Sequence, residues 1–147
     1  MKFQEFVDHK KTVKVGVVGF SAQKFDVSKA KAHIVEAFDK IEKDFSPKNI
    51  HCISGLTDLG IPALAYREAK KRGWKTVGVA CSKALEYDLF NVDETILVGK
   101  EWGDESDTFL SMLDVMVKVG GGKQSAAEAE KAEANGVSVM KFDLKSE

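Results

Sequence analysis

The stretch KVGGGKQSAAE, residues 118–128, combines residue types that could bind and act on a charged ligand. Three glycines end an apolar run, Lys123 follows them, and a helical pattern begins directly afterwards. Glycines let a ligand approach the backbone, and the free N–H groups of a helix start favour a phosphate or a carboxylate. The stretch therefore predicts an anion site with Lys123 as a counter-charge. The simpler alternative is a tight turn before a helix, with Lys123 in solvent.

Glu128 has three roles open to it. Ser125 and Glu128 have the S-x-x-E spacing of a capping box, in which the two side chains satisfy free N–H groups at a helix start. The same carboxylate could instead contact a ligand or take part in proton transfer. Capping is the first interpretation of the spacing, and the other two roles stay open.

The elements that must position these residues alternate along the chain between short β-branched runs and helical patterns. Strands are expected at 12–18, 49–53, 75–80, 94–98, 114–119 and 137–142. Helices are expected at 26–45, 62–72, 106–112 and 126–135. Such alternation implies right-handed crossovers and a parallel sheet. We therefore expect an α/β fold, a three-layer Rossmann-like sandwich with a mostly parallel sheet, in a single domain over residues 1–147.

In open parallel sheets, ligands bind at the carboxyl ends of the strands. The loops expected there are rich in glycine and in hydroxyl side chains, and several of them meeting at one sheet edge favour an anionic small ligand. The expected ligand-binding residues are Gly19, Ser21, Lys24, Gly55, Thr57, Gly120, Gly121, Gly122, Lys123, Gln124, Ser125 and Glu128.

Several of these residues have a simpler structural role available. Ser21 could be a turn hydroxyl instead of a phosphate donor, and Lys24 could be a solvated lysine. Thr57 and its neighbour Asp58 precede the helix that starts near Pro62, where short polar side chains commonly cap. Capping is the first interpretation for this pair.

Two further features lie near the expected site or carry local charge. Trp102 could stack on a base or pack on the neighbouring helix. An acidic group follows it and fits a solvated helix start: Asp104, Glu105 and Asp107. The basic run KKRGWK at 70–75 fits a helix end, where cations are favoured, better than a nucleic-acid surface.

Composition and charge restrict the classes of protein. A chain of 147 residues, 44% hydrophobic and 31% charged, fits one soluble domain with one core. The net charge of −1 gives no bulk attraction to nucleic acid or to an anionic membrane. The chain contains no apolar run near the roughly 20 residues of a membrane span, and its start lacks the apolar core of a signal peptide, so we expect a cytoplasmic protein. Cys52 and Cys81 are then expected as reduced core thiols.

Known cofactor motifs are not matched. GGGKQS at 120–125 departs from the GxxxxGK[ST] pattern of a P-loop, and GVVGFS at 16–21 departs from the dinucleotide fingerprint GxGxxG. His9, His33 and His51 show no spacing that suits a metal. We therefore expect neither a cofactor nor a metal, and neither NAD chemistry nor ATP hydrolysis.

Three segments together resemble the SLOG superfamily: GVVGFS at 16–21, SGLTDLGIPALAYREA at 54–69 and GGGKQSAAE at 120–128. This superfamily includes the LOG (lonely guy) cytokinin-activating phosphoribohydrolases, formerly described as lysine decarboxylases. Molybdenum-cofactor carrier proteins and the Rossmann part of DNA-processing protein A are also members. The resemblance implies a Rossmann-like domain that binds a nucleotide or nucleotide-derived ligand, often as a homodimer.

The third segment departs from the LOG motif PGGxGTxxE at three positions. Gly120 replaces the proline, Gln124 replaces the third glycine and Ser125 replaces the threonine. Gln124 thus has a side chain where the backbone of the relatives approaches phosphate. The matching positions are Gly121, Gly122 and Glu128. By resemblance, the carboxylate of Glu128 would accept a ribose hydroxyl.

The LOG enzymes also carry an arginine upstream of this motif, and the corresponding stretch KEWGDESD at 100–107 contains none. The two arginines of the chain, Arg67 and Arg72, fall in an earlier helix. Lys100 could replace the charge of an arginine but not its bidentate fork. We therefore expect a module that binds a phosphate- and ribose-containing ligand without catalysis. One alternative is a LOG-like nucleoside 5′-monophosphate phosphoribohydrolase that uses Glu128, and another is single-stranded nucleic-acid binding.

Overall fold

The computed structural model describes residues 12–21 and 24–147. The N-terminal stretch on which the expected absence of a signal peptide rests, and residues 22–23 of the first loop, lie outside this range. The six strands are β1 Val13–Gly19, β2 Ile50–Ser54, β3 Lys75–Ala80, β4 Glu94–Leu97, β5 Val115–Val119 and β6 Ser138–Phe142. The predicted strands agree with these bounds to within one residue at most ends.

All six strands form one parallel sheet in the order β4-β3-β2-β1-β5-β6. From β1 the chain adds strands in one direction as far as β4, and then returns to place β5 on the other side of β1. The order therefore reverses between β1 and β5. The carboxyl ends of these two strands are the place where a ligand site is expected in a sheet of this kind.

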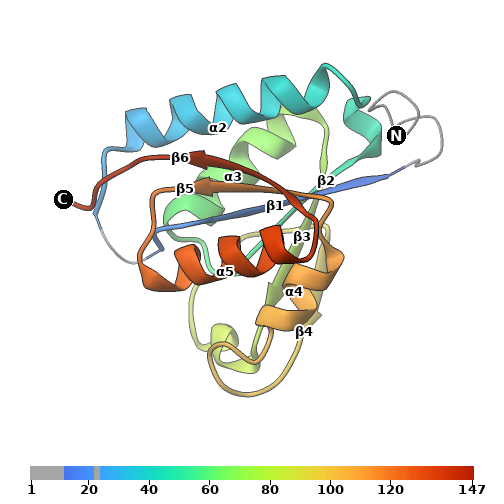
Figure 1. The fold of residues 1–147 in the computed structure, drawn as a ribbon. Coiled ribbons are helices and arrows are strands. Elements are labelled where there is room, and N and C mark those ends of the chain that lie inside the picture. Colours follow the sequence, from blue (N-terminus) through green and yellow to red (C-terminus); the bar gives the residue numbers. More distant parts are fainter. Residues whose placement is uncertain (1–11, 22–23) are drawn as a thin grey trace.

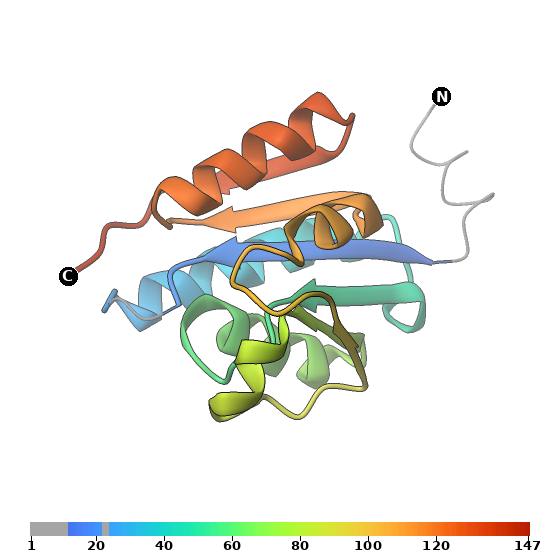
Figure 2. The same cartoon turned by 90° about the horizontal axis from the view of Figure 1, so that it is seen from below.

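Helices cover both faces of the sheet (Figures 1 and 2). The α-helices are α2 Val27–Glu42, α3 Gly60–Arg72, α4 Ser106–Met112 and α5 Lys123–Ala134, with 3-10 turns η1 Pro47–Asn49 and η2 Ser82–Glu86. Helices α2 and α3 pack side by side on one face, and α4 and α5 pack on the other. This confirms the predicted three-layer Rossmann-like α/β fold. No helix in the described part of the chain is long and apolar enough to cross a membrane.

Each face of the sheet has its own apolar layer, because successive side chains of a strand point to opposite faces. Val15 and Val17 of β1 pack with the inner side chains of α2 and α3, whereas Val18 packs with those of α4 and α5. Both cysteines are buried free thiols, and burial raises the pKa of the Cys52 thiol well above its usual range. The core therefore holds α3 and α5 against the strands that precede them in the chain.

The expected helix start at 26 and the expected helix end at 72 agree with the structure to within one residue, and one predicted cap is wrong. The Asp26 side chain caps α2 by accepting the Lys29 N–H at 3.1 Å, and Gly73, with φ of 81°, ends α3. Thr57 and Asp58 do not cap α3, whose N-cap position is Leu59. The reason is that α3 begins two residues before Pro62. Its Ile61 N–H is satisfied instead by the Phe20 carbonyl at 2.8 Å, and Asp58 pairs with Arg67 at 3.2 Å.

Candidate functional site

A cavity of about 210 Å³ lies at the carboxyl ends of β1, β2 and β3, between these ends and the starts of α4 and α5. Its polar lining comes from four segments that are far apart in sequence. The lining side chains that can form hydrogen bonds are Ser21, Ser54, Thr57, Trp102, Glu105, Ser106, Gln124, Ser125 and Glu128. Among the residues that the structure describes, the lining holds two carboxylates and neither lysine nor arginine.

The structure brings most of the predicted binding residues together. Those that line the cavity are Gly19, Ser21, Gly55, Thr57, Gln124, Ser125 and Glu128. Gly55 faces open space, so a ligand can approach the backbone there. The predicted residues that are not part of the cavity lining are Lys24, Gly120, Gly121, Gly122 and Lys123. Their proposed role in binding stays a prediction.

Two of the three glycines in the 120–122 turn have a structural reason to be glycine. Gly120 and Gly121 have φ of 60° and 96°, a region that other residues rarely adopt. A Cβ on Gly121 would also lie 2.6 Å from the Cβ of Ser125, and one on Gly120 would lie 2.7 Å from the Leu144 carbonyl oxygen. The turn therefore brings the end of β5 directly into α5.

The predicted capping box is wrong. Helix α5 begins at Lys123 instead of Ala126, with Gly122 as its N-cap and no side chain capping it. Ser125 is therefore the third residue of the helix and is only 6% exposed, and Glu128 lies in the second turn. The glycine turn explains the error, since positive φ angles let the helix start earlier than the S-x-x-E pattern suggests.

Glu128 does not cap the helix and lines the cavity instead. The Ser106 hydroxyl donates to its Oε2 at 3.3 Å, which joins the starts of α4 and α5 across the site. Burial raises the pKa of Glu128, the Ser106 hydrogen bond opposes that rise, and the neighbouring Glu105 carboxylate adds to it. Removing a carboxylate from water disfavours its charged form, so this group is poised to take a hydrogen bond or a proton.

The two lysines expected as phosphate counter-charges lie outside the cavity. Lys24 is exposed, and its carbonyl accepts the Glu147 N–H at 2.7 Å beside the C-terminal segment. Lys123 is exposed at the first position of α5. The donors that the cavity itself offers to an anion are therefore uncharged: backbone N–H groups, hydroxyls, the Gln124 amide and the Trp102 indole N–H.

Trp102 and Tyr87 meet at the mouth of the cavity. Their rings form an edge-to-face pair with centroids 5.8 Å apart, and Trp102 remains 53% exposed. The tryptophan was singled out by sequence as a possible base-stacking residue, whereas Tyr87 carried no signal, because the two rings come from separate loops. Glu105 was expected in a solvated helix cap but lines the cavity, while its neighbour Asp104 accepts the Lys100 and Glu101 N–H groups at 3.0 Å.

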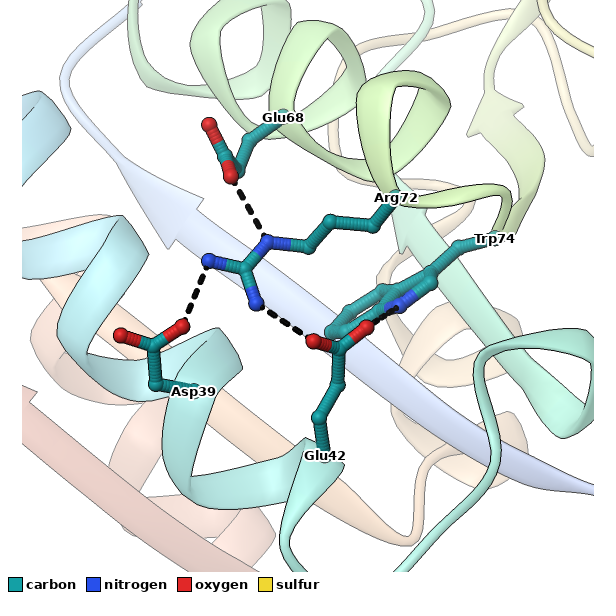
Figure 3. A network of polar contacts seen from close by, with 5 residues as sticks. All are labelled: Asp39, Glu42, Glu68, Arg72 and Trp74. Atoms are coloured by element: carbon teal, nitrogen blue, oxygen red, sulfur yellow. Dashed lines mark hydrogen bonds and ion pairs between the residues drawn. The ribbon is translucent and has the colours of Figure 1, made fainter.

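The basic run at 70–75 lies at the opposite edge of the sheet from the cavity. Arg72 is held there by the carboxylates of Asp39, Glu42 and Glu68, as Figure 3 shows. Lys75 pairs with Glu94 at 2.9 Å. Two of the four cations of the run are thus paired with carboxylates of the chain, which reduces what the run offers to a nucleic-acid backbone.

The fold and the site together define a class: a Rossmann-like α/β protein with a polar cavity where the strand order reverses. No family model matches the sequence, and no curated protein matches it. Solved structures with the same fold include a molybdenum cofactor carrier protein, a kind of protein that the predicted superfamily contains.

Three solved structures are similar over most of their length. The molybdenum cofactor carrier protein of Chlamydomonas reinhardtii has a TM-score of 0.69 and 23% identity over 88% of this chain and 76% of that protein. A further structure of that Moco carrier protein has a TM-score of 0.66 and 25% identity over 89% and 76% of the two chains. TM1055, a structural genomics target, has a TM-score of 0.68 and 24% identity over 87% and 72%. The predicted resemblance to the SLOG superfamily is thus confirmed at the level of the fold.

Proposed function

We propose that this protein binds a nucleotide or nucleotide-derived small molecule, containing phosphate and ribose, in the cavity at the carboxyl ends of the strands, without catalysing a reaction on it. The observation that carries the proposal is the convergence of Ser21, Gly55 and Ser125 on one cavity at the reversal between β1 and β5. The chemistry of that lining suits a small polar ligand whose parts meet different loops.

The phosphate is expected at the start of α5. No side chain caps this helix, so the N–H groups of its first turn are free of side-chain acceptors and the positive end of its dipole faces the cavity edge. The hydroxyls of Ser21 and Ser125 lie at the same edge and can donate to phosphate oxygens. These donors take the place of Lys24 and Lys123 as the expected partners of the phosphate.

The ribose is expected at Glu128. A carboxylate accepts hydrogen bonds from hydroxyl groups, and Ser106 orients this one toward the cavity. The rest of the lining near it is uncharged apart from Glu105. Two carboxylates would repel a second anion, so a neutral sugar suits this part of the cavity better.

A binding role is also supported by the solved structures. One structural neighbour is named as a molybdenum cofactor carrier protein. The sequence departs from the LOG motif at Gln124, which lines this cavity, and lacks the upstream arginine. Arg67 and Arg72, the arginines that exist, pair with acidic residues away from the cavity.

Calorimetry with AMP, GMP, ADP-ribose, ribose 5-phosphate and molybdenum cofactor tests the proposal. We expect binding below millimolar for at least one of them, and about a tenfold loss of affinity in Ser125→Ala and in Glu128→Gln. The matched control is Glu130→Gln, because Glu130 is an exposed residue of α5 that does not line the cavity. A folded protein that binds none of these ligands below millimolar would refute the proposal.

A hydrolase is the second candidate, and the raised pKa of Glu128 is what favours it. A LOG-like phosphoribohydrolase would use this carboxylate to assist cleavage of the N-glycosidic bond of a nucleoside 5′-monophosphate. Incubating the protein with AMP, CMP and GMP and separating free base from nucleotide tests this. Release of base that disappears in Glu128→Gln would support the enzyme, and release that persists would reassign the reaction to another group.

We also infer that the protein is a cytoplasmic homodimer built of one domain. The resemblance to the SLOG superfamily supports the dimer, and the two buried free thiols, Cys52 and Cys81, fit a reducing compartment. Sedimentation equilibrium of the full chain tests the first point. A monomer at all concentrations, with or without ligand, would contradict it.

A further inference from the structure

Trp102 occupies a position that core packing does not explain. Its ring borders three adjoining hollows, namely the cavity with Glu128, a second hollow toward Lys131 and a third toward Leu59. It is 53% exposed, and the edge-to-face contact with Tyr87 at 5.8 Å supports it from one side. An aromatic ring that is held by a neighbour and half exposed beside a polar cavity is a surface on which a planar ring can stack.

Glu105 is the acidic residue beside this ring that keeps acceptor capacity toward the cavity. Of the other acidic residues in 101–107, Asp104 accepts two backbone N–H groups, Glu101 pairs with Lys83, and Asp107 is exposed outside the cavity. Glu105 accepts only the Gly103 N–H, at 3.2 Å on Oε2, among the contacts described. A carboxylate has about four lone-pair positions, so most of its capacity remains.

We propose that Trp102 and Glu105 form the subsite for the ring of the ligand, an inference that rests on the proposed function. The ring that fits this subsite presents an N–H and an amino group side by side. Guanine and pterin rings both have this 2-amino-4-oxopyrimidine edge. A carboxylate only accepts hydrogen bonds, and it matches two adjacent donors with its two oxygens. Adenine and cytosine instead present a donor beside an acceptor, so one oxygen of Glu105 would face a lone pair.

Ring specificity can be separated from phosphate binding by a panel of ligands. GMP, AMP, guanosine, pterin and ribose 5-phosphate are titrated against the full chain by calorimetry. We expect GMP to bind about tenfold or more tightly than AMP, because hydrogen bonds to a charged acceptor are among the stronger ones. Guanosine and pterin carry the ring edge without phosphate, so they report on the subsite alone and distinguish a nucleotide from a pterin ligand.

Two substitutions assign the preference to the two side chains. Glu105→Gln exchanges an acceptor-only group for a donor and acceptor pair, and we expect it to abolish the preference for GMP and shift it toward AMP. Trp102→Ala removes the stacking surface and should weaken GMP and AMP alike by about tenfold, while ribose 5-phosphate binds as before. The matched controls are Glu101→Gln and Leu85→Ala, since neither residue lines a hollow at the site.

Fluorescence gives a second readout, because the chain has two tryptophans. Trp74 is 3% exposed in the core, so quenching by an added guanine or pterin ring reports on Trp102, and it should vanish in Trp102→Phe. Equal affinity for GMP and AMP that Glu105→Gln leaves unchanged would overturn this inference. If ribose 5-phosphate still binds in that case, the proposed function stands. If no phosphate ligand binds while guanosine or pterin does, the proposed function fails and the ring subsite remains.

Discussion

The two edges of the sheet use the same kinds of charged residue in opposite ways. At the amino-terminal edge, three nitrogens of the Arg72 guanidinium donate to three carboxylates at 2.7 to 2.8 Å. The Trp74 indole N–H donates to the second oxygen of Glu42 at 2.8 Å (Figure 3). The Trp74 ring also stacks on Phe38 with centroids 4.2 Å apart. Acid, base and tryptophan satisfy one another here.

At the carboxyl-terminal edge, the corresponding residue types are left open. Glu128 accepts one hydrogen bond at 3.3 Å, and Trp102 exposes about half of its surface. The described lining of the cavity contains neither lysine nor arginine to neutralise its two carboxylates. Groups that satisfy one another stabilise a fold, whereas groups held in place without complete partners remain available to a ligand. The comparison therefore assigns stability to one edge and binding to the other.

Arg72→Ala should have the largest effect on stability. It removes three charge-assisted hydrogen bonds and leaves three carboxylates close together, so we expect the free energy of unfolding to fall by about 3 kcal/mol. Urea denaturation measures this. Arg67→Ala is the control, because that arginine is 60% exposed and makes one pair with Asp58, for which the expected loss is about 0.5 kcal/mol. Ligand affinity should not change in either variant.

Equal losses of stability in the two arginine variants would contradict this assignment. The amino-terminal cluster would then be a set of solvated surface pairs, and the distinction between the two edges would disappear.

Gly121→Ala should have the next largest effect, and it acts on the other edge. The new Cβ would lie 2.6 Å from the Ser125 Cβ at a φ of 96°, which should cost about 2 kcal/mol in backbone strain and displaced packing. Since Ser125 lines the cavity, binding should weaken as well. Gly122→Ala is the control for stability, with open space at the Cβ and a φ of −98°. A variant that loses stability but binds normally would show that the turn does not position the cavity.

The fold could be predicted from the sequence because its signals are local and repeated. Each β-branched run became a strand, and Asp26 and Gly73 mark helix ends through their own side chain or backbone freedom. The start of α5 was misplaced since the capping pattern at Ser125 and Glu128 competes with the glycine turn before it. The local sequence does not show whether the capping pattern or the glycine turn determines where the helix begins.

The site could be predicted only in part. Glycine and hydroxyl residues at strand ends follow from the topology, and most of those predicted do line the cavity. The pairing of Tyr87 with Trp102 depends on how two loops fold over each other. Contacts of this kind have no fixed spacing, so the sequence carries no pattern for them.

Asp93 should make stability at the amino-terminal edge fall in acid. The Thr76 N–H donates to its Oδ2 at 2.8 Å and thereby lowers the pKa of Asp93. A lowered pKa means that the unfolded chain binds the proton first as the pH falls. The stability is therefore present above the ordinary aspartate pKa and is lost as the pH falls through the folded value. Asp93→Asn should cost about 1 kcal/mol at pH 7 and little at pH 2, as measured by denaturation at both pH values. Equal costs at the two pH values would contradict this.

Glu128→Gln should have the smallest effect, with the opposite sign. Burial raises the pKa of Glu128, so the folded protein binds its proton more tightly than the unfolded chain does. The ionised carboxylate then costs stability as the pH rises from the ordinary glutamate pKa through the folded value, and the full cost is present above it. Glu128→Gln should raise the free energy of unfolding at pH 7 by less than about 1 kcal/mol and leave it unchanged near pH 3.

Glu128→Gln should also weaken ligand binding at pH 7. A variant that gains stability and loses binding separates the two edges of the sheet most clearly. Glu42→Gln at the other edge should lower stability, because it weakens the hydrogen bonds from Arg72 and Trp74, and should leave binding alone. Thermal denaturation and calorimetry on the two variants measure both quantities. A Glu128→Gln protein that is less stable at pH 7 would show that this carboxylate belongs to the folding framework, as Glu42 does, and is not held in reserve for a ligand.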